Sequence, residues 1–239
     1  MSATLAIAGR DLRASFLSPG GYVIVALFLV ATSLVFNFGG VFEQGQIASM
    51  RGVVQAGTWL LLLVAPAISM KAVIEELRLG TFEALATAPV SDVQVILGKF
   101  LSGAGFLAIL LALTAVFLVA LELHGRPDYG EVACGYLGMA LAGGAYLSAG
   151  LLASCLSGSQ VVAYLLTVFF WFTLSVGTAV LPAHVPDHIA ATLFALNPEL
   201  RLNDFAIGLI DTSNVVYFAT LIVVFLAAAV VSLQVRRSW

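Results

Sequence analysis

Apolar stretches without charge alternate with short polar segments along the whole chain. The interval 132–186 is more than twice the length of one membrane span and contains no Lys, Arg, Asp or Glu. Because a spanning helix needs about 20 residues, this interval predicts two spans, joined by the turn-forming sequence Ser157-Gly-Ser-Gln160. We therefore expect an all-α membrane protein with six transmembrane helices, near residues 21–42, 52–74, 93–121, 132–156, 161–181 and 212–235.

The composition supports a membrane protein. Of the 239 residues, 61% are hydrophobic and 10% are charged. A soluble domain is typically about 45–50% apolar and about 25% charged. The length predicts one transmembrane domain over residues 1–239, with no large soluble appendage.

The basic residues predict the orientation, because Lys and Arg collect on the cytoplasmic side of membrane proteins. If the amino terminus is cytoplasmic, three of the ten Lys and Arg residues lie outside and seven lie inside. The seven are Arg10, Arg13, Lys71, Arg78, Lys99, Arg236 and Arg237. We therefore expect a multi-pass protein with both termini in the cytoplasm.

Residues 4–18, before the first span, predict an amphipathic helix at the cytoplasmic interface; the alternative is a simple tethering tail. At helical spacing, Leu5, Leu12 and Phe16 fall on one apolar side. The charged residues fall away from that side: Arg10, Asp11 and Arg13.

The segment 182–211 is too apolar for an open loop, yet each half is too short to span. It predicts two short re-entrant helices before the last span. Backbone at membrane depth must be sheltered by protein or face a water-filled cavity. The segment is therefore a candidate gate, with a structural cap as the equal alternative, and its candidate residues are Asn197, Pro198, Phe205, Gly208 and Asp211.

The sequence offers little support for catalysis or for an ion-coupled carrier. It contains no hydrolase or metalloprotease motif. Gly98-Lys99 lacks the glycine and the Ser or Thr that complete a phosphate-binding loop, because Val93 and Phe100 occupy those positions. No ionisable residue is expected well inside a span, where coupled carriers usually place them. We expect no catalytic residue, no metal site and no cofactor in this chain.

The most charged segment lies between the second and third predicted spans. Five charged residues fall within residues 71–83. The pattern Glu75-Glu76-x-Arg78-x-Gly80-Thr81-x-Glu83-x-Leu85, continued by Ala88-Pro89-Val90-Ser91 and Gly98-Lys99-Phe100, resembles the cytoplasmic hairpin of ABC-2 type transporter permeases. The closest likeness is to the subgroup with the gliding-motility permease and the permease of nitrous oxide reductase maturation. A second match is Phe205-x-x-Gly208-x-Ile210-Asp211, followed by Val215-Val216-Tyr217-Phe218.

The resemblance covers essentially the whole chain and implies a function. The hairpin 75–90 would be the coupling element that docks on a separate cytoplasmic ABC ATPase subunit, through Glu75, Glu76, Arg78, Gly80, Thr81 and Glu83. The structural alternative is a solvated polar turn that only fixes topology.

The resemblance also implies the assembly. The chain would be the permease subunit of an ABC exporter, not itself an enzyme, in the bacterial cytoplasmic (inner) membrane. It would form a homodimer, or a heterodimer with a related permease, and would contact membrane lipids but no nucleic acid. A second hypothesis is a non-transporting anchor or mechanical transmitter driven by the same ATPase.

Overall fold

The computed structural model describes residues 3–38, 49–78, 90–123 and 127–237, and these are almost entirely helical. No strand occurs in these ranges. The long helices are α2 (Pro19–Phe38), α3 (Arg51–Ser69), α6 (Asp92–Glu122), α7 (Tyr129–Leu156), α8 (Gln160–Val180) and α11 (Thr212–Arg237). The short ones are α1 (Ala3–Leu17), α4 (Ile74–Arg78), η1 (Leu181–His184), α9 (Asp187–Leu196) and α10 (Pro198–Ala206).

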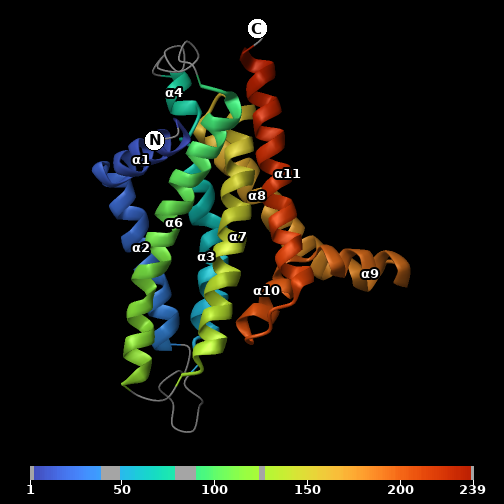
Figure 1. Cartoon of the computed structure of the whole chain (residues 1–239). Coiled ribbons are helices and arrows are strands. Elements are labelled where there is room, and N and C mark those ends of the chain that lie inside the picture. The colour runs from blue at the N-terminus through green and yellow to red at the C-terminus, as the bar shows by residue number, and fades with distance from the viewer. Residues whose placement is uncertain (1–2, 39–48, 79–89, 124–126, 238–239) are drawn as a thin grey trace.

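Six helices of the described part are long and apolar enough to cross a membrane, so the predicted fold class is confirmed. Figure 1 shows them as an elongated bundle. Both chain ends and α4 lie at one end of the bundle, and α1 lies across that end. In the other half, α9 projects sideways from the long helices, while α10 packs against α7 and α3. That α9 and α10 enter the outer leaflet stays a prediction.

Helix α7 is the centre of the bundle and the most buried of the six candidate spans. It packs against α3, α6, α8, α10 and α11. Its small residues make this possible: a Cβ on Gly143 would lie 2.5 Å from Leu107 of α6, and a Cβ on Gly150 would lie 2.0 Å from Ser69 of α3. Close approach of neighbouring helices across small residues is the usual packing mode in membranes.

Two rows of small residues on α7, Ala140-Gly144-Ser148 and Ala145-Ala149-Ala153, take part in this packing. All members except the exposed Ala140 are buried in the bundle: Gly144, Ala145, Ser148, Ala149 and Ala153. Both cysteines, Cys134 and Cys155, are also buried on this helix.

Helix α1 is present, but one part of its predicted amphipathic pattern is wrong. Leu5 is 54% exposed, whereas Ile7 is buried. Asp11, expected on the polar side, faces the bundle, where it reaches Lys99. The reason is that α1 packs along α6 and not only against lipid: a Cβ on Gly98 would lie 2.9 Å from the side chain of Ile7.

Candidate functional site

The connection between α3 and α4 is fastened to two other helices. Helix α3 ends at Ser69, and residues 70–73 form a turn whose backbone groups leave the helical pattern. The Ser154 hydroxyl donates to the carbonyl of Met70 at 3.1 Å and accepts from the N–H of Val73 at 3.2 Å. The ammonium of Lys99 donates to the carbonyl of Ala72. Buried backbone groups need such partners, so α7 and α6 together hold the start of α4 in place.

Lys99 owes its position to the start of α6. Ser91 caps this helix: its hydroxyl accepts from the N–H of Gln94 at 3.3 Å, and the Gln94 side chain accepts from the N–H of Ser91 at 3.0 Å. This reciprocal capping box fixes the helix start. Lys99 then lies about two turns inside the helix, with its side chain only 2% exposed.

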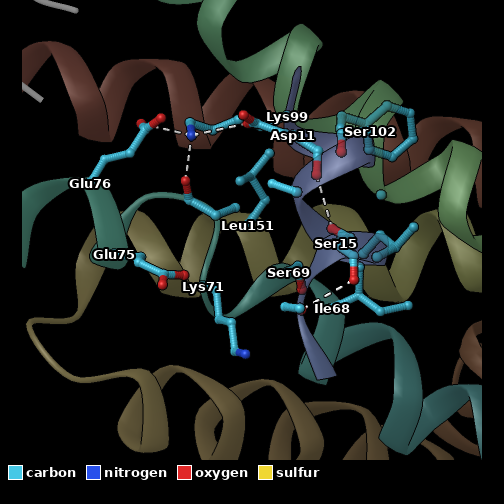
Figure 2. Close-up of a pocket in the computed structure, with 16 residues that line it drawn as sticks. Asp11, Ser15, Ile68, Ser69, Lys71, Glu75, Glu76, Lys99, Ser102 and Leu151 are labelled. Atoms are coloured by element: carbon cyan, nitrogen blue, oxygen red, sulfur yellow. Dashed lines mark hydrogen bonds and ion pairs between the residues drawn. The ribbon is translucent and has the colours of Figure 1, made fainter. Parts of the chain in front are cut away.

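The ammonium of Lys99 is the centre of a ring of four charges. It lies 2.7 Å from Glu76 Oε2 and 3.5 Å from Asp11 Oδ2, as Figure 2 shows. Arg10 closes the ring, with Nη2 at 2.6 Å from Glu76 Oε1 and Nε at 2.8 Å from Asp11 Oδ1. Positive and negative groups alternate, so the ring is neutral overall. It joins α1, α4 and α6.

The ring accounts for the burial of a cation near the end of the bundle. An unpaired ammonium is costly to remove from water, and paired carboxylates offset that cost. Burial lowers the pKa of Arg10, but hydrogen bonds and charges from Asp11 and Glu76 outweigh burial and raise it above its usual value. The guanidinium therefore stays positive.

A cavity of about 290 Å³ opens beside the ring. Its floor is apolar and includes Ile68, Leu147 and Leu151, while the exposed side chains of Lys71 and Glu75 also line it (Figure 2). The described lining residues include no histidine or cysteine. The ring beside it ties α1, α4 and α6 together.

The predicted ATPase-coupling residues fall into three groups. Glu75 is exposed on α4, and Glu76 is held inside the ring with its side chain 15% exposed. Arg78 is the last residue of α4, and its side chain lies outside what the structure describes. Gly80, Thr81 and Glu83 also lie outside the described residues. Contact with an ATPase stays a prediction for all six.

The roles of Lys99, Arg10 and Asp11 were not predicted from the sequence. Arg10 and Lys99 were expected only to mark the cytoplasmic side, Asp11 was expected on the polar side of the first helix, and no ionisable side chain was expected well inside a span. The predicted span 93–121 already contained Lys99, and the capping pair Ser91 and Gln94 shows that the helix starts there. The two residues of α1 carried no comparable signal, since only packing shows which side of that helix faces α6.

The first two candidate gate residues shape the start of α10. Asn197 is 2% exposed, and its side-chain oxygen accepts from the N–H groups of Glu199 at 2.8 Å and Leu200 at 3.1 Å. Pro198 occupies the first turn, where its missing N–H costs nothing. Both residues therefore form a helix cap.

The remaining three gate residues form the join between α10 and α11. Phe205 is fully buried, and a Cβ on Gly138 of α7 would lie 2.7 Å from the Cβ of Phe205. Gly208 has φ +84°, a conformation that favours glycine. Asp211 caps α11 by accepting from the N–H of Ser213 at 2.8 Å. These contacts are structural, and a gating movement stays a prediction.

The fold and the site can now be compared with known proteins. Residues 43–233, about four fifths of the chain, match the family model for ABC-2 family transporter proteins. The chain belongs to the ABC-2 transporter family. Membership makes it a multi-pass ABC transporter permease and implies association with an ABC ATPase. The match does not assign a subgroup, and a comparison with curated proteins finds no match.

The structure explains two of the sequence motifs of this ABC-2 permease. In Gly98-Lys99-Phe100, the glycine admits α1 and the lysine holds the charge ring. In Phe205-x-x-Gly208, the aromatic ring packs α10 on α7 and the glycine ends that helix.

Proposed function

We propose that this permease couples ATP hydrolysis by separate ATPase subunits to export, and that α4 begins the segment on which an ATPase docks. The observation that carries the proposal is the charge ring around Lys99. In this proposal two permeases form the membrane part, and α4 and both termini face the cytoplasm. The common position of α4 and the termini at one end of the bundle supports this orientation (Figure 1).

A docking element transmits force only if it is joined firmly to the helices that must move. Helix α4 is short, five residues, and would bend away alone. The ring fixes Glu76 to α6 through Lys99 and to α1 through Arg10. Ser154 adds a link to α7. A push on α4 would therefore move α1, α6 and α7 together.

The two glutamates of α4 have different roles in this proposal. Glu75 is exposed and available to a partner, whereas Glu76 faces the ring. Reversing the charge of Glu76 would break the ring, so a loss of function could come from weaker docking or from weaker transmission of movement. Glu75 is therefore the clean probe of docking, and Lys99 is the clean probe of transmission.

Co-purification with the partner ATPase and transport in proteoliposomes test both roles. We expect Glu75→Lys to weaken ATPase association at least several-fold. Lys99→Met should keep association and ATP hydrolysis but lower export per ATP hydrolysed. Arg13→Glu reverses an exposed charge at the same end of the bundle and serves as the control for Glu75→Lys. Full association of the Glu75→Lys variant would show that the docking surface lies elsewhere, and unchanged coupling in Lys99→Met would remove the transmitting role of the ring.

A further inference from the structure

A second and larger cavity lies in the other half of the bundle, away from α4. Its volume is about 570 Å³, and residues of α3, α7, α8 and α10 line it. Cavities of about 300–1,000 Å³ hold drug-sized molecules. The cavity is therefore large enough for a small amphipathic molecule.

Polar residues of α3 and α10 form the mouth of this cavity. The indole N–H of Trp59 donates to Glu199 Oε1 at 2.9 Å, and the amide of Gln55 donates to Asn203 Oδ1 at 3.3 Å. All four side chains belong to exposed residues. The two contacts join α10 to α3 at the cavity and place the carboxylate of Glu199 beside Trp59.

Glu199 gives the cavity its charge. Among the described lining residues it is the one with a formal charge at neutral pH. The nearest basic residue in sequence, Arg201, is engaged elsewhere: its guanidinium donates to the carbonyl of Ala195 and to Asn214, and it lies 4.4 Å from the ring centre of Tyr217. In the described part of the chain, no Lys or Arg forms a salt bridge with Glu199.

The inner end of the cavity is buried but still polar in part. Tyr146 is 2% exposed and Ser175 is 4% exposed, and both line the cavity. Neither side-chain hydroxyl has a hydrogen-bond partner among the residues that the structure describes. Both hydroxyls face the cavity lining and are free to form a hydrogen bond with a polar group at the inner end of an occupant. Val54 and Leu62 supply apolar surface between the two ends.

We propose that this cavity binds an organic cation with an apolar body. The carboxylate of Glu199 pairs with the positive group at the mouth, next to the aromatic face of Trp59, which also attracts cations. The apolar body fills the cavity, and Tyr146 and Ser175 bind its inner polar group. An anionic molecule meets an unpaired carboxylate at the entrance and is disfavoured. If the chain is an exporter, such a cation is its cargo, and this last step rests on the proposed function.

Binding to the purified full chain in nanodiscs of zwitterionic lipid tests the charge preference. Tetraphenylphosphonium and tetraphenylborate have nearly the same shape and opposite charge, and binding to empty nanodiscs is subtracted. We expect saturable binding of the cation, at least tenfold tighter than that of the anion. Equal binding of both probes would overturn the proposal and would mean an apolar groove that any lipid-like molecule fills.

Three variants locate the binding site. Glu199→Gln keeps an acceptor for Trp59 and should lower the affinity for tetraphenylphosphonium about tenfold or more, whereas Asp187→Asn, an exposed position on α9, should leave it unchanged. Ser175→Leu fills the inner end and should also reduce binding, which keeps the test valid if the first variant does not fold. Unchanged affinity in a folded Glu199→Gln variant would contradict the proposal.

The inner hydroxyls need a probe that can form hydrogen bonds. Ethidium is a cation with two amino groups, so Tyr146→Phe should lower the affinity for ethidium more than the affinity for tetraphenylphosphonium. Equal losses of affinity for both probes would show that the Tyr146 hydroxyl does not bind the polar group of the occupant. These binding assays contain no ATPase, so they test the cavity separately from the coupling function. A failure of cation binding would leave the coupling proposal standing, and a failure of ATPase association would leave the binding proposal standing.

Discussion

Replacing Lys99 by methionine tests whether the charge ring stabilises this end of the bundle. Methionine keeps the length and the apolar stem of lysine but removes the ammonium from Glu76, Asp11 and the carbonyl of Ala72. Removing one partner of a buried ion pair typically costs about 3–5 kcal/mol. Here the carboxylates of Glu76 and Asp11 are 15% and 23% exposed and keep Arg10 as a partner. We therefore expect a smaller loss of unfolding free energy, about 2 kcal/mol.

Unfolding with sodium dodecyl sulfate in mixed micelles measures this loss. Lys71→Met is the matched control, because Lys71 is exposed in the turn next to the ring and should change the free energy by less than about 0.5 kcal/mol. A double-mutant cycle with Glu76→Gln isolates the pair. Once the carboxylate is neutral, loss of the ammonium should cost less, giving a coupling energy of about 1–2 kcal/mol. Additive losses, or equal losses in Lys99→Met and Lys71→Met, would refute the role assigned to the ring.

Three other positions give predictions, two of which thermal unfolding checks and one of which cysteine labelling checks. Gly98→Val should lower stability by about 1–3 kcal/mol because α1 must move away from α6, whereas Gly9→Ala, with open space around it, should be neutral or stabilising. Gly208→Ala should lose about 1–2 kcal/mol at φ +84°, while Gly158→Ala, which meets no neighbouring atom, should change little. Arg201→Lys should raise the labelling rate of cysteines placed on α10, since lysine cannot keep the forked contacts to α9 and α11; unchanged labelling would contradict that reading.

Much of the fold was predictable because membrane spans are local features. In a bilayer every backbone group must be satisfied within its own helix, so the length and charge of each stretch suffice to locate a span. The same reasoning separated two helices inside the long uncharged interval, at Ser157–Gln160. The motifs at 75–91 and 205–211 then indicated the family, which the family match confirmed.

The sequence alone thus determined six apolar helices long enough to span a membrane and an ABC-2 permease. Only the tertiary structure decided where the charges go. Arg10, Glu76 and Lys99 are far apart in sequence, and their contact depends on how closely α1 can approach α6. The larger cavity likewise exists because α10 folds back over α3 and places Glu199 beside Trp59. Hydrophobic patterning fixes which segments enter the membrane, whereas steric fit between helices fixes which polar side chains meet.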